Sequence, residues 1–170
     1  MSVHCLILGG ARSGKSRMAE DLGRDWHGPR IYLASGEAGD EEMRRRIDLH
    51  RRGRGALWET IEEPVAILEQ LRRLSGSRTF ILFDCVTLWL SNLIHRSLDV
   101  RAAVDELAGA LPGLPGRIVI VSNEVGLGIV PDNALARRFR DEAGRANQRL
   151  AEACGEVVFV AAGLPVKLKG

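Results

Sequence analysis

Five short apolar segments recur along the chain and predict strands that are buried on both faces. They are rich in Val, Ile, Leu and Phe and do not alternate with polar residues, which is typical of a sheet covered on both sides. The five segments are residues 3–8, 30–34, 79–84, 117–122 and 156–161.

Segments with helical patterning lie between these strands. They are residues 13–26, 40–52, 64–74, 87–95, 100–111 and 133–153. Pro64 is expected in the first turn of its helix, where a missing N–H group does no harm. Because strands and helices alternate from end to end, we expect a three-layer α/β fold with a mostly parallel central sheet. A chain of 170 residues suits one domain, so a single domain over residues 1–170 is predicted.

The composition is that of an ordinary globular protein, with 45% hydrophobic and 27% charged residues. The formal net charge is +2, and lysine is rare among the 24 basic residues, so the sequence lacks the lysine-rich patch that would indicate nucleic-acid binding. No apolar segment approaches the roughly 20 residues needed to span a bilayer, and the N-terminus lacks a signal-like pattern. We therefore expect neither a nucleic acid nor a membrane as a partner.

The three cysteines, Cys5, Cys85 and Cys154, lie among apolar or small residues, and their spacing fits no zinc motif. We expect buried free thiols. Free thiols are typical of a reducing compartment, which predicts a cytoplasmic protein.

The first predicted strand leads directly into GGARSGKS, which fits the phosphate-binding pattern G-x-x-x-x-G-K-[ST]. Its glycines let backbone N–H groups approach phosphate oxygens, and the following helix N-terminus adds a favourable dipole. Lys15 is expected to reach the β- and γ-phosphates, and the Ser16 hydroxyl to ligate Mg²⁺. The alternative, a simple turn between strand and helix, gives this lysine and serine no packing purpose. The candidate nucleotide-binding residues of this segment, called the phosphate loop below, are Gly9, Gly10, Ala11, Arg12, Ser13, Gly14, Lys15 and Ser16. Together with the alternating elements, the motif predicts a P-loop NTPase domain of the RecA-like kind.

The third predicted strand, TFILFD, ends at Asp84. An acid at the end of an apolar strand is the usual second protein partner of Mg²⁺ in P-loop proteins. The alternative is a carboxylate that caps the helix after it.

The segment DEEMRRRIDLHRRGR, residues 40–54, places one histidine among six arginines. Met43, Ile47 and His50 share one helical face, so His50 is expected at the edge of a packed surface. Arginines attract phosphate, and an imidazole beside a phosphate is a candidate nucleophile. The alternative is a solvated charged helix with an incidental histidine.

These motifs resemble those of the bifunctional adenosylcobinamide kinase / adenosylcobinamide-phosphate guanylyltransferases of cobalamin biosynthesis. The matching stretches follow the family's order and span nearly the whole chain. They are GGARSGKS (9–16), DEEMRRRIDLHRRGR (40–54) followed by Trp58, FDCVTLWLSNL (83–93) and VSNEVGLGIVPDNALARRFRDEAGRANQRLAE (121–152). The last stretch is the most specific, because a generic P-loop kinase has no reason to carry it.

The resemblance implies two reactions. In the family, ATP or GTP phosphorylates the aminopropanol hydroxyl of adenosylcobinamide. The histidine that matches His50 attacks the α-phosphate of GTP, and the guanylyl-histidine then passes GMP to adenosylcobinamide phosphate, giving adenosylcobinamide-GDP. The resemblance also implies a homo-oligomer, since the family forms compact trimers.

Further nucleotide-binding positions are implied by the same resemblance. One group follows the second strand, another follows the histidine, and a glutamate lies past Trp58. These residues are Ala34, Ser35, Gly36, Arg51, Arg52, Gly53, Arg54 and Glu62. For Glu62 the alternative is a surface glutamate. Asp84 stands where family members carry glutamate in some cases, and aspartate ligates Mg²⁺ equally well.

Three further features have both a structural and a functional interpretation. The segment NEVGLGIVP contains Asn123, Glu124, Gly126 and Gly128, and either borders the active site and the corrinoid or forms a structural turn. The apolar face of helix 133–153 is expected to be core or subunit interface and not part of the site; it consists of Leu135, Phe139, Ala143, Ala146 and Leu150. Trp58 and Trp89 are expected to pack in the core and not to contact a cofactor.

Two rival functions remain at this stage. One is a P-loop small-molecule kinase without guanylyl transfer. A nucleophilic role of His50 would distinguish the bifunctional enzyme from such a kinase. The other is a regulatory or nucleic-acid-binding ATPase, which the near-neutral charge disfavours.

Overall fold

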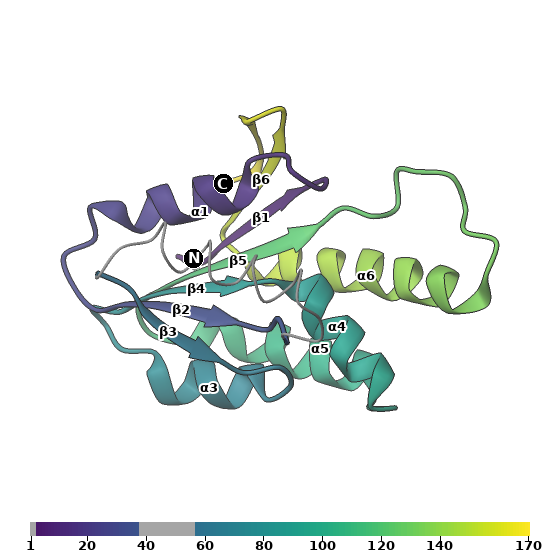
Figure 1. Cartoon of the computed structure of the whole chain (residues 1–170). Coiled ribbons are helices and arrows are strands. Elements are labelled where there is room, and N and C mark those ends of the chain that lie inside the picture. Colours follow the sequence, from purple (N-terminus) through teal and green to yellow (C-terminus); the bar gives the residue numbers. More distant parts are fainter. Residues whose placement is uncertain (1–2, 38–56) are drawn as a thin grey trace.

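The computed structural model describes residues 3–37 and 57–170, and all strands of this part belong to one sheet (Figure 1). The spatial order is β3-β2-β4-β5-β1-β6-β7. Neighbouring strands are parallel, except that β7 runs antiparallel to β6. The strands are β1 (Cys5–Gly9), β2 (Arg30–Ala34), β3 (Glu59–Glu62), β4 (Phe80–Asp84), β5 (Arg117–Asn123), β6 (Glu156–Ala161) and β7 (Leu164–Lys169). The predicted α/β fold with a mostly parallel sheet is confirmed, and β5 lies between the phosphate-loop strand β1 and the Asp84 strand β4.

Helices cover both faces of the sheet. Among the described helices, α1 (Lys15–Arg24) lies on one face, and the other helices lie on the opposite face (Figure 1). These are α3 (Ile67–Leu74), α4 (Val86–His95), α5 (Val100–Ala110), the short 3₁₀ helix η1 (Leu111–Gly113) and α6 (Ala134–Ala153). No helix in the described ranges is both long enough and apolar enough to cross a membrane.

Two cores, one on each face, explain the unbroken apolar strands. Successive residues of a strand point to opposite faces. In β1, Leu6 and Leu8 join the core against the larger helical layer, whereas Cys5 and Ile7 join the core against α1. Because both faces are dry, every position of β1 is apolar or glycine, and the strand shows no alternation.

The five strands expected from sequence are confirmed, with ends within two residues of the predicted ones. Two edge strands, β3 and β7, were not predicted. Neither carries the continuous apolar sequence of a central strand, because an edge strand of a sheet buries less of its surface.

The helix predicted for residues 64–74 begins later, at Ile67. Oε1 of Glu63 accepts hydrogen bonds from the N–H groups of Val65 and Ala66, both at 2.9 Å. This turn precedes the helix, so the placement of Pro64 in the first helical turn was wrong. The helix predicted for residues 40–52 lies outside the described residues.

Both tryptophans singled out from the sequence pack against phenylalanine rings, as predicted. Trp58 meets Phe80 edge-on with centroids 5.8 Å apart, and Trp89 meets Phe83 at 6.1 Å. The three cysteines are buried free thiols, which confirms the expectation for them.

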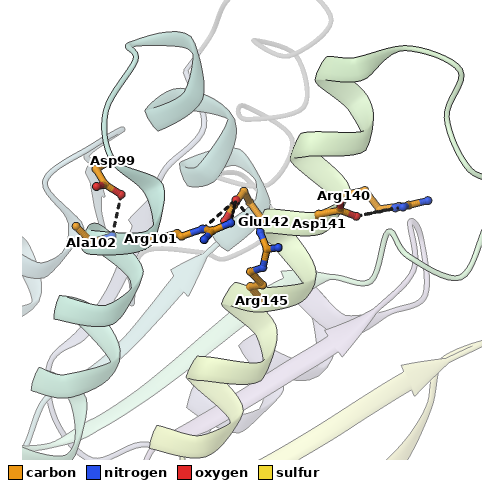
Figure 2. Close-up of polar contacts among 7 residues, drawn as sticks. All are labelled: Asp99, Arg101, Ala102, Arg140, Asp141, Glu142 and Arg145. Atoms are coloured by element: carbon orange, nitrogen blue, oxygen red, sulfur yellow. Dashed lines mark hydrogen bonds and ion pairs between the residues drawn. The ribbon is translucent and has the colours of Figure 1, made fainter.

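Helix α6 is fixed at its start and on its flank. The Asn133 side chain accepts a hydrogen bond from the N–H group of Ala136 at 2.7 Å and so caps the helix. The Glu142 carboxylate accepts hydrogen bonds from Arg101 of α5 and from Arg145 one turn further along α6 (Figure 2). Since Glu142 is largely buried, its pairing with Arg101 helps to fix how α6 lies on α5.

The predicted apolar face of α6 is mostly core. Ala143, Ala146 and Leu150 are buried, and Phe139 packs against them from the edge. Leu135 departs from the pattern, because its side chain is 55% exposed beside the loop.

Candidate active site

The phosphate loop joins the carboxyl end of β1 to the amino end of α1, as its motif predicts. Gly14 has a φ of 98°, a left-handed value that glycine adopts without strain. A Cβ atom on Gly9 would lie 2.5 Å from the carbonyl oxygen of Val160, so no side chain fits there. The two glycines therefore allow backbone to approach backbone at both ends of the loop.

Lys15 spans the loop from its first helical position. Its ammonium Nζ donates a hydrogen bond to the carbonyl oxygen of Gly10 at 2.9 Å, and the residue is only 8% exposed. Burial lowers the pKa of Lys15, whereas the nearby Asp84 carboxylate acts to raise it. A desolvated ammonium held between loop and carboxylate is ready to exchange its carbonyl partner for a phosphate oxygen.

The Ser13 hydroxyl is a second polar group held inside the loop. Its Oγ is buried and has no hydrogen-bond partner among the described residues. Buried hydroxyls without a partner are rare, and they point to a ligand or water that completes them. A phosphate oxygen would satisfy this group, so the loop fits the anion that its motif predicts.

Asp84 ends β4 at the same edge of the sheet. Its Oδ2 accepts a hydrogen bond from the hydroxyl of Tyr32 at 2.8 Å. Helix α4 has Cys85 at its N-cap and no side-chain cap hydrogen bond, so Asp84 does not cap it. The carboxylate is instead oriented by Tyr32 and acts electrostatically on Lys15, which suits a group near bound phosphates.

A magnesium site at this position would use hard oxygen donors. Mg²⁺ in nucleotide sites takes one or two carboxylates together with phosphate oxygens and water. Asp84 and the Ser16 hydroxyl in the first turn of α1 supply donors of that kind. Among residues 3–37 and 57–170, no group of three or more His, Cys, Asp or Glu could hold a metal by itself. The donor set therefore fits Mg²⁺ shared with a nucleotide.

Three predicted positions lie in one row across the sheet. Ala34 of β2 pairs in register with Glu62 of β3 on one side and with Asp84 of β4 on the other. Glu62 is exposed at the end of its strand. The fold thus brings these three residues to one carboxyl edge, where open α/β sheets bind ligands.

Ser35 is placed differently from its expected neighbours. The residue is fully buried, and its hydroxyl donates to the carbonyl oxygen of Cys85 at 2.7 Å and accepts from the Cys85 N–H group at 2.9 Å. The side chain therefore holds the end of β4 through the Cys85 backbone. Gly36 follows it, and a Cβ there would only touch Leu88.

The segment after β5 starts beside the phosphate loop. Asn123 pairs in register with Gly9, and the N–H group of Glu124 donates to the Gly9 carbonyl oxygen at 3.0 Å. The Asn123 amide also donates to the hydroxyl of Thr87 at 2.7 Å. This geometry favours a border of the site for Asn123 and Glu124, although Oε1 of Glu124 is taken up by the N–H group of Gly126 at 2.6 Å.

Several polar residues of this edge were not singled out from the sequence. The Tyr32 hydroxyl donates a hydrogen bond to Asp84, and the Thr87 hydroxyl accepts one from the Asn123 amide. The Asn92 amide donates to the carbonyl oxygens of Ser35 and Pro64. Tyr32 was hidden inside an apolar strand and Asn92 inside a helix. The one available signal was an isolated polar group in an otherwise apolar run.

The remaining predicted residues lie outside the described part of the chain. They are His50, Arg51, Arg52, Gly53 and Arg54.

Comparison with known proteins gives matches along nearly the whole chain. The family model described as "Cobinamide kinase / cobinamide phosphate guanyltransferase" matches residues 5–168. The bifunctional adenosylcobalamin biosynthesis protein CobP of Pseudomonas aeruginosa is 50% identical over 170 residues, which cover 97% of this chain and 96% of that protein. The bifunctional adenosylcobalamin biosynthesis protein CobU of Escherichia coli is 39% identical over 179 residues, which cover 96% and 98%.

Among solved structures, the P4 protein of bacteriophage phi6 in complex with ADP aligns with a TM-score of 0.49 and 15% identity, covering 96% of this chain and 52% of that chain. The family and sequence matches include the phosphate loop, Asp84 and the loop after β5. The chain belongs to the cobinamide kinase / cobinamide phosphate guanyltransferase family.

Proposed function

We propose that this chain, as a single domain over residues 1–170, phosphorylates adenosylcobinamide with ATP or GTP and then transfers GMP from GTP to the product. The products of the second reaction are adenosylcobinamide-GDP and pyrophosphate. The observation that carries the proposal is the family match over residues 5–168. The complete phosphate loop, with its buried lysine and its hydroxyl without a partner, supports it.

The described residues serve both reactions by binding a triphosphate. Backbone N–H groups of the phosphate loop and the Lys15 ammonium bind the phosphates, and Ser16 and Asp84 would hold Mg²⁺. When bound, the ion neutralises phosphate charge during transfer. Phosphoryl transfer needs mainly positioning and charge stabilisation, which these groups provide.

The positions at the carboxyl edge would complete the nucleotide site. Ala34, Gly36 and Glu62 line it beside Asp84. Ser35 contributes through the backbone that it holds at the end of β4.

The guanylyl transfer rests on His50, by the family resemblance. A ring nitrogen of the neutral imidazole attacks the α-phosphorus of GTP, a P–N bond forms, and the bond to the β-phosphate oxygen breaks to release pyrophosphate. A phosphate oxygen of adenosylcobinamide phosphate then attacks the same phosphorus and frees the imidazole. Arg51, Arg52 and Arg54, with Gly53 between them, would stabilise the charge that develops.

The loop after β5 carries exposed apolar side chains that are suited to contact with a partner. Val125, Leu127, Ile129 and Val130 are all exposed, and Ile129 is 98% exposed. Contiguous exposed apolar side chains mark interaction surfaces. We propose that copies of the chain associate as a homotrimer in the cytoplasm and that this loop also borders the corrinoid. Light scattering on the purified protein measures the mass of the assembly, and a monomer would contradict this part.

Intact mass spectrometry after incubation with Mg²⁺ and GTP tests the proposed transfer. We expect a gain of one GMP on the wild type and none on His50→Ala. The adduct should be acid-labile, as a phosphoramidate is, and it should disappear when adenosylcobinamide phosphate is added.

Radiolabelled nucleotides give the matched control. GTP labelled on its α-phosphate should label the protein, whereas GTP labelled on its γ-phosphate should not. His50→Ala should retain phosphorylation of adenosylcobinamide. A wild type that phosphorylates adenosylcobinamide but never gains GMP would be a kinase alone, and absence of both activities would refute the proposal.

A further inference from the structure

Burial of apolar side chains does not explain why the last strand of the chain, β7, is held on the sheet. All six of its residues are exposed, and its apolar side chains Leu164, Val166 and Leu168 are 69%, 53% and 59% exposed. A strand that buries so little adds little hydrophobic stabilisation. Its two ends, however, make specific contacts.

The turn before β7 reaches the phosphate loop. The N–H group of Gly163 donates a hydrogen bond to the carbonyl oxygen of Ser13 at 2.8 Å. A Cβ atom on Gly14 would lie 3.1 Å from the Cα atom of Gly163, so the two glycines are in close backbone contact. Figure 1 shows the hairpin of β6 and β7, in yellow, rising beside the purple segment that follows β1.

The shape of this turn depends on two left-handed residues. Ala162 has a φ of 51° and Gly163 a φ of 79°. Consecutive positive φ values are typical of the two-residue turns that join antiparallel strands. Such a turn projects its backbone beyond the strand ends, here toward Ser13.

The far end of β7 is anchored on another helix. Nζ of Lys169 donates to the carbonyl oxygens of Ala151, Glu152 and Cys154, at 2.8, 3.0 and 2.7 Å. Carbonyl groups at a helix C-terminus lack partners within the helix, and a cation there is favourable. The hairpin is therefore held at α6 while its turn contacts the phosphate loop.

Peptide geometry links this contact to phosphate binding. The peptide unit is planar and trans, so its C=O and N–H groups point in opposite directions. Gly163 binds the C=O group of the Ser13–Gly14 peptide from outside the loop. The N–H group of Gly14, in the same peptide, is thereby aimed away from the hairpin. In a phosphate loop the backbone N–H groups must face the ligand.

We propose that Gly163 is a positioning residue for nucleotide binding, because its N–H group holds the Ser13–Gly14 peptide in the orientation that presents the Gly14 N–H group to phosphate. The inference rests on the proposed function only in so far as the phosphate loop binds a nucleoside triphosphate. It extends that function to a C-terminal turn that carries none of the predicted site residues.

Gly163→Val tests this proposal. A β-branched residue at a φ of 79° is strained, so the turn must change and withdraw its N–H group. We expect the Kd for an α,β-methylene analogue of GTP, measured by calorimetry with Mg²⁺, to rise about tenfold, as for loss of one good hydrogen bond. In turnover assays the KM for ATP and for GTP should rise similarly, with kcat little changed.

Lys169→Met is the matched control. It removes the anchor on α6 and leaves the turn residues intact. It should lower Tm without changing the Kd. A Kd that is unchanged in Gly163→Val, or that rises equally in Lys169→Met, would overturn the proposal.

A milder variant covers the case in which Gly163→Val does not fold. Gly163→Ala also places an L side chain at a left-handed φ, but its Cβ meets nothing within 4 Å, so it should displace the turn and its N–H group less than valine does. It should raise the Kd by a smaller factor, and no rise at all would also overturn the proposal. If the wild type binds the analogue but transfers no GMP from GTP, the proposed function fails while the positioning by Gly163 still stands.

Discussion

The hydroxyl of Tyr32 donates a hydrogen bond to Oδ2 of Asp84 at 2.8 Å, although the two residues lie on different strands and 52 positions apart. Tyr32 is 6% exposed and sits in the core under α1, so its ring is fixed by packing. A hydroxyl on a fixed ring gives the carboxylate one preferred orientation. Residues that orient a metal-binding carboxylate are part of the metal site in energetic terms.

Tyr32→Phe should therefore weaken Mg²⁺ binding without removing the ring. We expect the Mg²⁺ concentration for half-maximal activity to rise about tenfold or more, with nucleotide saturation held constant. Thr79→Val is a control, because it removes a buried hydroxyl just before β4, at the opposite end from Asp84. An unchanged Mg²⁺ requirement in Tyr32→Phe would mean that Asp84 does not bind the metal or needs no orienting partner.

Lys15→Met should separate stability from function. The Lys15 side chain is buried in the folded state, and this desolvation lowers the pKa of its ammonium group. Replacing it by an apolar side chain of similar length should leave Tm unchanged or raise it. Nucleotide binding should weaken by about 2–5 kcal/mol, the usual loss for one partner of a buried charge interaction. Calorimetry and thermal unfolding on the same samples measure both effects, with the exposed Lys167→Met as control. A Tm that falls in Lys15→Met along with the nucleotide affinity would contradict this separation.

The central part of the fold could be predicted because its signals are local. The five central strands are continuous apolar segments, and the phosphate loop is a motif whose chemistry lies in adjacent residues. β3, with the sequence ETIE, carries no such signal, because it is short and lies at the sheet edge. β7 includes Pro165 and two lysines, so composition argued against a strand.

The contacts that orient the site could not be read from local patterns. Ser35 and Cys85 are joined across 50 positions, and Asn92 reaches back to Ser35 across 57. Nothing in the sequence near Ser35 indicates that its hydroxyl is used inside the sheet. Its expected contact with nucleotide came from the family resemblance and stays a prediction, whereas the side-chain contacts with Cys85 are a feature that the resemblance did not include.

His4 predicts a dependence of stability on pH. The side chain is 1% exposed, its Nδ1 accepts from the Ile118 N–H group at 3.1 Å, and its Nε2 contacts the carbonyl oxygen of Leu111 at 2.8 Å. Burial lowers the pKa of His4 from 6.5. The unfolded chain therefore takes up a proton at a higher pH than the folded protein does. Stability should be complete above the unfolded pKa and should fall as pH drops below it, until the folded pKa is reached.

Urea unfolding between about pH 8 and pH 5 measures this dependence. His4→Asn should be less stable near neutral pH by about 1 kcal/mol or more, since the shorter side chain cannot keep both the Ile118 and the Leu111 contacts. Its stability should fall less on acidification than that of the wild type. If the free energy of unfolding of the variant falls with pH as steeply as that of the wild type, other groups dominate the loss of stability in acid.

The thiols should be unreactive in the native protein even beside the active site. Burial raises the pKa of Cys5 to about 12, of Cys85 to about 11 and of Cys154 to about 12. The thiolate is the reactive form, so all three should resist a disulfide reagent at mild alkaline pH and react once urea unfolds the chain. Cys85 is the sharpest case, because it follows Asp84 and its Sγ lies 3.2 Å from the hydroxyl of Thr87. Rapid labelling of Cys85 with loss of nucleotide binding would mean that the end of β4 opens in solution.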